Sequence, residues 1–203
     1  MLCVLGVLKT AEGLKIKKEM LDWLSKYHDV ICVEQEPPGV LFEYPAIKKV
    51  IDLAIEKNEP VLYIHTKGAA NKVVPGYEKH DMEKKCSKMP KNTDNSDSQV
   101  IFRKMWKKEF TDNIQKYLDA VDTDKPTVSC PYTGKEKVTW KNAWVINPAA
   151  AKELKKTFHI DKNRFYYERM FTGTDIDVIG IIDGNVDTKN RFDTMWNSVW
   201  KYM

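Results

Sequence analysis

The segment NEPVLYIHTKG, residues 58–68, decides the fold of this chain. A turn signal, Asn58-Glu59-Pro60, ends the preceding helical pattern, and the apolar run Val61–Ile64 follows it. A short apolar run bounded by a turn is typical of a buried strand, and this one leads directly into the polar residues His65–Gly68. The segment therefore predicts a buried strand whose carboxyl end presents polar side chains.

Two earlier apolar runs, Met1–Leu8 and Val30–Val33, also have the character of strands. Between the runs, apolar residues at helical spacing predict helices over Lys15–His28 and Pro45–Lys57. The resulting order, β-α-β-α-β with short connections, favours a mostly parallel sheet flanked by helices. We therefore expect an α/β, Rossmann-like fold, in which ligands bind beyond the carboxyl ends of the strands.

Residues 72–98 depart from this pattern because they are rich in Lys, Asn, Asp and Ser, and we expect a mobile loop that closes as a lid. Beyond the loop, further elements complete a single domain over residues 1–203. They are a helix over residues 99–118, strands over Thr127–Cys130 and Val138–Ile146, a helix from Asn147 to Phe158, a short helix over Arg164–Met170, a strand over Val178–Ile182 and a C-terminal helix over residues 190–202.

The amino-acid composition excludes several classes of protein. Of the 203 residues, 42% are hydrophobic and 11% are aromatic, which is enough for a core and excludes a disordered chain. The 33 Lys and Arg nearly balance the 29 Asp and Glu, and the small net charge of +4 argues against nucleic acid as a partner. The four cysteines form no Cys-x-x-Cys pair, so a structural zinc site is not expected and a reducing compartment fits best.

The apolar start of the chain, Met1–Leu8, ends at Lys9. This run is far shorter than the ~20 apolar residues that a membrane span needs, and no basic leader precedes it. We therefore expect a soluble, cytoplasmic protein. Trp196 and Trp200 of the predicted tail helix leave open a peripheral contact with a membrane, as does a basic helix face formed by Lys104, Lys107 and Lys108.

His65, Thr66, Lys67 and Gly68 form the candidate ligand site. His65 and Lys67 share a side if the strand stays extended, and Gly68 permits close approach of the backbone to a ligand. An imidazole, a hydroxyl and an ammonium at one strand end can neutralise a phosphate or a diphosphate. The alternative is that His65 only caps the strand and that Lys67 is a solvated loop lysine.

Four motifs occur in the same order as in small bacterial glycosyltransferase-like proteins of surface-polysaccharide gene clusters, which this chain resembles over residues 1–175. They are VLYIHTKGAA at residues 61–70, MWKKEF at residues 105–110, WKNAWV at residues 140–145 and RFYYE at residues 164–168. The chain departs from the family pattern at Lys141 and Val145, where a Gly and a second Trp are common. These departures concern the acceptor rather than the fold.

The resemblance implies a GT-A-like fold that binds a nucleotide sugar, with the nucleotide near Thr10 and Glu34 and the diphosphate at His65–Gly68. In that fold an Asp-x-Asp at a strand end usually holds a divalent metal, whereas the third strand here ends in His-Thr-Lys. We therefore expect a site that requires no cofactor, with Mn²⁺ or Mg²⁺ left open. Asp122 and Asp124 are weak metal candidates, since their setting is more typical of a turn.

The resemblance also implies a catalytic carboxylate and an acceptor site. Glu168 is the candidate general base, and the alternative is an exposed ion pair between Arg164 and Glu168 on one helix face. Asn142 and Trp144, which share a strand face with Trp140 if Val138–Ile146 is a strand, are expected to bind a glycan or a lipid-linked acceptor. Core packing is the alternative for the tryptophans.

These observations predict a glycosyltransferase of surface polysaccharide synthesis. It would move a sugar from a nucleotide-diphosphate donor to the acceptor. The alternative is a catalytically inactive relative that binds a nucleotide or a glycan.

Overall fold

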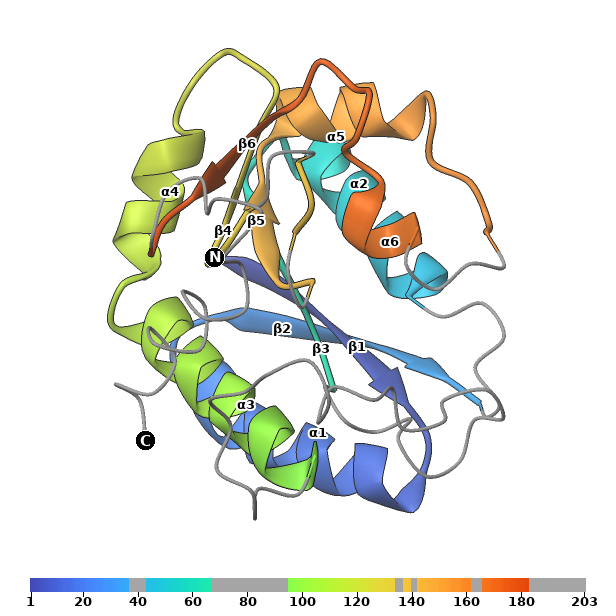
Figure 1. The fold of residues 1–203 in the computed structure, drawn as a ribbon, viewed down its shortest axis with the longest axis vertical. Coiled ribbons are helices and arrows are strands. Elements are labelled where there is room, and N and C mark those ends of the chain that lie inside the picture. The colour runs from blue at the N-terminus through green and yellow to red at the C-terminus, as the bar shows by residue number, and fades with distance from the viewer. Residues whose placement is uncertain (37–42, 67–94, 134–136, 140–141, 162–165, 183–203) are drawn as a thin grey trace, which may run out of the picture.

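The computed structural model describes residues 1–36, 43–66, 95–133, 137–139, 142–161 and 166–182. Helices and strands alternate along much of this part of the chain (Figure 1). The elements are β1 (Leu2–Leu8), α1 (Ala11–Leu24), β2 (Asp29–Gln35), α2 (Tyr44–Lys57), β3 (Val61–His65), α3 (Asn95–Thr111), α4 (Ile114–Val121), β4 (Thr127–Cys130), β5 (Trp144–Ile146), α5 (Pro148–Lys155), α6 (Tyr166–Arg169) and β6 (Asp177–Gly180).

The strands of the described residues form one sheet in the order β2-β1-β3-β5-β4-β6. β1 runs parallel to β2 and β3, and β4 runs parallel to β6. β5 is antiparallel to both of its neighbours, β3 and β4. The predicted α/β class, with a sheet flanked by helices, is therefore confirmed, and the sheet is mixed because β5 is reversed.

Helices cover both faces of the sheet, which gives the described part of the chain two cores. α1 and α3 lie on one face, and α2, α5 and α6 lie on the other (Figure 1). The alternation of side chains in β1 supplies both cores, because Cys3 and Leu5 belong to the α1 side and Val4 belongs to the α2 side. Burial on both faces explains why β1 is a continuous apolar run.

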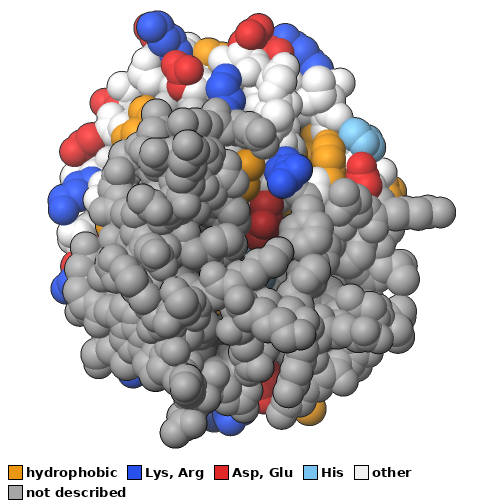
Figure 2. Space-filling model, viewed as in Figure 1, with side chains coloured by type: hydrophobic (Ala, Val, Ile, Leu, Met, Phe, Trp, Pro, Cys, Tyr) orange, Lys and Arg blue, Asp and Glu red, His pale blue; other side chains and the backbone are white. Residues whose placement is uncertain are grey.

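The surface carries both signs of charge. On the described part of the face shown in Figure 2, Lys and Arg side chains are interspersed with Asp and Glu. One such group joins two helices, because Asp52 of α2 lies 2.6 Å from Lys48 Nζ and 3.7 Å from Lys155 Nζ of α5. These pairs are exposed, so they add little to stability.

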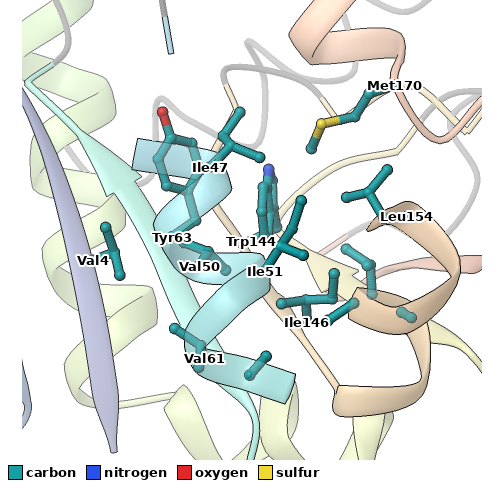
Figure 3. Packing of buried hydrophobic residues seen from close by; sticks show 14 of the residues in the cluster. Val4, Ile47, Val50, Ile51, Val61, Tyr63, Trp144, Ile146, Leu154 and Met170 are labelled. Carbon is teal, nitrogen blue, oxygen red and sulfur yellow. The ribbon is translucent and has the colours of Figure 1, made fainter. Parts of the chain in front are cut away.

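The core on the α2 side surrounds Trp144 of β5 (Figure 3). The indole packs 4.9 Å from the ring of Tyr63 on β3 and meets Phe171 edge-on at 5.7 Å. Figure 3 shows Ile51 of α2 and Leu154 of α5 around the same ring. Trp144 is 0% exposed, so it anchors the reversed strand in the core.

Several element boundaries differ from the sequence prediction, and two of the differences have a clear local cause. The first helix spans Ala11–Leu24 rather than Lys15–His28, because Thr10 caps it: the Thr10 hydroxyl accepts a hydrogen bond of 2.9 Å from the Gly13 amide. The predicted strand Val138–Ile146 is reduced to β5, Trp144–Ile146. Asn142 has a φ of +53°, which is incompatible with a continuous strand.

The predicted loop over residues 72–98 is also too long, since α3 begins at Asn95. Residues 72–94 and the predicted C-terminal helix over residues 190–202 lie outside the described residues. The single helix predicted over residues 99–118 is wrong in a different way, because α3 ends at Thr111 and α4 starts at Ile114.

A buried carboxylate accompanies the break between α3 and α4. Glu109 is 3% exposed; its Oε1 accepts from Asn113 Nδ2 at 3.1 Å and its Oε2 accepts from the Tyr117 hydroxyl at 3.0 Å. Asn113 precedes α4, but its side chain makes no capping bond there because its amide faces Glu109. Apolar residues continue at helical spacing across the break, so the sequence pattern does not show it.

Gly13 sets how closely α1 approaches the end of β1. A Cβ atom at Gly13 would lie 1.9 Å from the carbonyl oxygen of Leu8, a distance that no side chain can keep. Glycine is therefore required by this close approach, although it is a weak helix former.

Gly13→Ala is predicted to lower the free energy of unfolding by about 1–3 kcal/mol, because the added methyl group displaces backbone. An alanine in an ordinary helix interior would instead stabilise by roughly 0.5–1 kcal/mol. Urea unfolding of the variant, beside Glu12→Ala as an exposed control in the same turn, measures the sign. A variant as stable as the wild type would contradict the close approach.

His28 is a buried histidine in the connection between α1 and β2, and it contacts α3. Its Nε2–H donates to the carbonyl oxygen of Phe110 at 2.7 Å, and its Nδ1 is buried without a hydrogen-bond partner. Burial lowers the pKa of His28, and the N-terminal amino group also lowers it, whereas the Phe110 carbonyl and Asp29 oppose the shift. The folded protein therefore binds this proton less readily than the unfolded chain does.

We predict that this histidine contributes to acid sensitivity. Because the folded pKa lies below the unfolded value of 6.5, stability is present at neutral pH and is lost as the pH falls below that value. His28→Gln should flatten the decline in unfolding free energy between neutral pH and pH ~5. His159→Gln, which changes an exposed histidine, should leave the decline unchanged; equal slopes in all three proteins would exclude His28 as the cause.

Candidate functional site

Polar residues gather at the edge of the sheet where β1, β2 and β3 end. These strands are parallel, so their carboxyl ends meet at one edge. β5 is reversed and pairs Trp144 with Tyr63, so the segment that enters β5 reaches the same edge. Asn142 precedes β5 and Glu43 precedes α2, and both therefore lie near His65 at the end of β3.

The Glu43 carboxylate is the centre of this edge. Its Oε2 accepts a hydrogen bond of 3.0 Å from the Tyr63 hydroxyl and another from Asn142 Nδ2, and it lies 3.8 Å from His65 Nδ1. The Glu43 side chain is 25% exposed, whereas that of His65 is 13% exposed. Two other segments, distant in sequence, thus converge on this partly buried carboxylate. We call the four residues the Glu43 cluster: Glu43, Tyr63, His65 and Asn142.

Gly6 of β1 leaves room for the Glu43 cluster. It pairs with His65, and a Cβ atom at Gly6 would lie 3.1 Å from Ala46 Cβ and 3.6 Å from the Tyr63 hydroxyl. The first distance is tighter than an ordinary contact between side chains, and the second is an ordinary van der Waals contact. A larger residue at this position would therefore press on Ala46 of α2.

Asn142 connects the Glu43 cluster to the core. Its Oδ1 accepts from Trp144 Nε1 at 2.8 Å and from the Thr139 hydroxyl at 3.3 Å, while its Nδ2 donates to Glu43. Asn142 is fully buried, and its left-handed backbone is one that asparagine tolerates better than most residues. The side chain therefore satisfies two buried donors and holds the carboxylate.

The acceptor platform predicted from the sequence is wrong in its geometry. Asn142 and Trp144 do not share a strand face, because the strand begins only at Trp144. Trp144 is buried on all sides and offers no exposed ring face to a sugar. Trp140, the other tryptophan of that prediction, lies outside the described residues.

Asn142→Ala is predicted to lower the free energy of unfolding, because the Trp144 N–H loses its acceptor in the core. The expected loss is about 1–3 kcal/mol in addition to the cost of placing alanine in a left-handed backbone conformation. Asn58→Ala is the matched control, since Asn58 is exposed and has the same φ of 53°. The difference between the two variants in chemical denaturation isolates the hydrogen bonds. Equal losses would show that Asn142 matters only for its backbone.

Glu168, the predicted general base, lies on α6 and is partly exposed. Its carbonyl oxygen accepts from the Thr139 amide at 2.9 Å, and the Thr139 hydroxyl bonds Asn142. Backbone contacts therefore tie α6 to the Glu43 cluster. Arg164, which the alternative pairs with Glu168, lies outside the described residues.

The other predicted binding residues make internal bonds. The Thr10 hydroxyl caps α1, and the Thr66 hydroxyl accepts from the Leu8 amide at 3.4 Å; both threonines are buried. Glu34 of β2 lies 2.6 Å from Lys17 Nζ, and the hydrogen bond from Lys17 lowers the pKa of the Glu34 carboxyl. Lys67 and Gly68 follow Thr66 but lie outside the described residues.

Asp122 and Asp124 are far from the Glu43 cluster. They are exposed in the connection from α4 to β4, which lies at the amino end of β4. Because β5 is antiparallel to both β3 and β4, that end of β4 lies at the edge opposite His65. Within the described ranges, His, Cys, Asp and Glu side chains form no group of three or more that could hold a metal ion.

Glu43 is the residue of this site that the sequence analysis missed. It stands directly before the helix that Pro45 opens, in a proline-rich connection, and no motif marks it. Its position after β2 and before α2 was the available signal, because connections of that kind reach the carboxyl edge of a sheet.

Comparison of the chain with protein-family models, with curated proteins and with solved structures gave no match. Among the helices in the described ranges, none has the length and the hydropathy that crossing a bilayer requires. The functional argument therefore depends on the residues themselves.

Proposed function

We propose that this chain is a glycosyltransferase with a GT-A-like form of the α/β fold. It moves a sugar from a nucleotide-diphosphate donor to a hydroxyl group of a glycan or lipid-linked acceptor in surface polysaccharide synthesis. The observation that supports this best is the convergence of Tyr63, His65 and Asn142 on the Glu43 carboxylate at the carboxyl edge of the sheet. Ligands of open α/β sheets bind at this edge.

A carboxylate is the group that such a transfer needs. The acceptor oxygen attacks the anomeric carbon, the bond from that carbon to the diphosphate breaks, and the diphosphate leaves with the bonding electrons. The hydroxyl proton passes to a general base. Glu43 and Glu168 are the candidates, since both are partly exposed and Thr139 connects their segments through Asn142.

Charge separates the roles of His65 and Lys67. An ionised Glu43 lies 3.8 Å from His65 Nδ1 and repels an anion there, so a protonated His65 first neutralises Glu43. We therefore assign binding of the diphosphate mainly to Lys67 and Gly68, which follow β3 in the sequence. We assign to His65 the position between the Glu43 carboxylate and the diphosphate. The nucleotide stays assigned to the ends of β1 and β2, near Thr10 and Glu34.

The proposal requires no cofactor, because Lys67 and a protonated His65 would supply part of the positive charge that a metal supplies elsewhere. A Mn²⁺ or Mg²⁺ ion bound by Asp122 and Asp124 would lie at the wrong edge of the sheet to bridge that diphosphate. Turnover measured with and without a chelator tests this part.

Glu43→Gln is predicted to keep the fold and to lower turnover by about 10²–10⁴-fold. The fold persists because Tyr63 and Asn142 both donate to Oε2, a position that an amide oxygen can take. Release of nucleoside diphosphate from a panel of nucleotide sugars measures turnover, and thermal unfolding checks the fold. Glu36→Gln, at an exposed carboxylate on the same edge, is the control.

The comparison with Glu168→Gln decides which carboxylate is the base, because the variant with the larger loss identifies it. Failure of every nucleotide sugar to react with the wild-type protein, with or without added Mn²⁺, would contradict the proposal.

A catalytically inactive relative that binds a nucleotide or a glycan is the second candidate. One observation favours it: Oε2 of Glu43 already accepts bonds from two internal donors, as a purely structural carboxylate does. This candidate predicts saturable binding of a nucleotide sugar without release of diphosphate, so the same assay separates the two.

A further inference from the structure

β2 forms one edge of the sheet that the described residues build, and β1 is the only strand of that sheet beside it. The strand is seven residues long and contains neither lysine nor proline. Its register against β1 continues residue by residue from Asp29 to Gln35, so no bulge interrupts it. Edge strands are usually protected by short length, bulges, lysine or proline, and β2 has none of these protections.

The opposite edge of the same sheet is protected. β6 has only four residues; it begins with the exposed carboxylate of Asp177 and ends at Gly180. A short strand with a charge at one end and a glycine at the other is a poor template for a further strand. Of the two edges of this sheet, only β2 therefore offers a long and regular one.

The backbone of β2 presents a ladder of hydrogen-bonding groups on its outer side. The Asp29 amide donates to the Met1 carbonyl oxygen at 3.0 Å, so the peptide groups of Asp29 and of every second residue after it point toward β1. Peptide groups alternate along a strand, so the N–H and C=O groups of Val30, Cys32 and Glu34 point away from β1. A further strand could pair with all of them.

The side chains of β2 are apolar but only half covered. Val30, Ile31, Cys32 and Val33 are all partly exposed, whereas Cys3, Val4 and Leu5 on the neighbouring β1 are fully buried. Val30 and Cys32 pack against the core of the α1 side, and Ile31 and Val33 pack against that of the α2 side. Both faces of this edge could therefore bury more apolar surface if the sheet continued beyond β2.

We propose that β2 pairs with β2 of a second copy of this chain, antiparallel and centred on Cys32, so that two sheets join across a twofold axis. This register places Val30 opposite Glu34 of the second copy and Cys32 opposite Cys32 of the second copy. Each of the three resulting pairs exchanges two hydrogen bonds, so every outward N–H and C=O group between Val30 and Glu34 is satisfied.

The side chains of β2 complement themselves in this register. On the α2 side, Ile31 faces Val33 of the second copy and Asp29 faces Gln35, so a β-branched pair is flanked by a carboxylate opposite an amide. On the α1 side, Glu34 faces Val30 and keeps its own counter-charge, since Lys17 Nζ lies 2.6 Å away. No like charges oppose each other across the seam, which is why a second copy fits this edge.

The inference does not depend on the proposed function, because the contact uses the backbone of β2 and leaves the Glu43 cluster at the carboxyl edge untouched. The pairing also leaves the Glu34 carboxylate with Lys17. A chain without transferase activity would therefore still dimerise, and an active chain that stays monomeric would contradict only this inference.

The first test uses the cysteine at the centre of the contact. Opposite residues of a hydrogen-bonded antiparallel pair have Cα atoms about 5.5 Å apart, within the range that a disulfide spans. Mild oxidation of the whole chain carrying Cys86→Ser should therefore give a disulfide-linked dimer on non-reducing gels. Adding Cys32→Ser should abolish this dimer, whereas adding Cys3→Ser, which changes a fully buried thiol, should not.

The second test removes one outward donor. Val30→Pro deletes an N–H that does not pair with β1 and should weaken dimerisation roughly tenfold or more in sedimentation equilibrium, whereas the control Val30→Ala keeps the N–H and the dimer. Thermal unfolding checks that both variants are folded. In the wild-type chain, hydrogen exchange at the Cys32 and Glu34 amides should slow as the protein concentration rises.

Three results would overturn the inference: the wild-type chain stays monomeric up to millimolar concentration, the folded Val30→Pro variant dimerises as well as Val30→Ala, or oxidation gives no dimer that depends on Cys32. Protection of the Cys32 amide that does not change with concentration would also overturn it, because a segment of the same chain would then cover the edge. If Val30→Pro does not fold, oxidation and hydrogen exchange of chains with Val30 intact decide.

Discussion

A carboxylate that leaves water must receive hydrogen bonds or a counter-charge, and Glu43 obtains them from two other segments of the chain. Tyr63 and His65 come from the end of β3, and Asn142 comes from the entry into β5. The start of α2 is thereby fixed against the middle of the sheet. Loss of any one donor would leave the charge of the Glu43 carboxylate less well compensated. The contributions of these contacts to stability are therefore coupled.

The same constraint arranges the edge of the sheet that carries the candidate site. Asn142 links the Glu43 carboxylate to the core, because its Oδ1 accepts from Trp144. Thr139 links Asn142 to α6, because its hydroxyl donates to Asn142 and its amide donates to the Glu168 carbonyl. Packed and hydrogen-bonded neighbours hold a side chain in one orientation, which catalysis by a general base requires. Around this fixed centre, Tyr44 and Tyr166 are partly exposed, and both stack on Phe158.

Local sequence patterns predicted much of the fold. The turn before Val61, the apolar runs and the cap at Asn147, whose Oδ1 accepts from the Ala150 amide at 2.8 Å, are local signals, and the structure confirms them. The reversed direction of β5 and the break after α3 were not predictable in this way. The direction of β5 depends on a partner distant in sequence, Tyr63 for Trp144, and the break after α3 accompanies a specific contact between Glu109 and Tyr117. A periodic pattern contains neither.

The candidate site was likewise predictable only where its features are local in sequence. His65 was found because its position at a strand end is a local property, and its proximity to Glu43 is now added. Glu43 was missed because a carboxylate before a helix is common, and only the folded chain shows what converges on it. Trp144 was misassigned because an aromatic residue beside an amide has the same sequence pattern in a core as in a sugar site.

The reversal of β5 makes the polar cluster a check on strand alignment. Side chains alternate along a strand, so a slip of one residue against β3 would turn Trp144 out of its core and draw Asn142 away from Glu43. Misaligned molecules would then carry a partly buried carboxylate that has lost one of its two donors, and they would be less stable. The contacts that build the candidate site thus also favour the strand alignment on which the site depends.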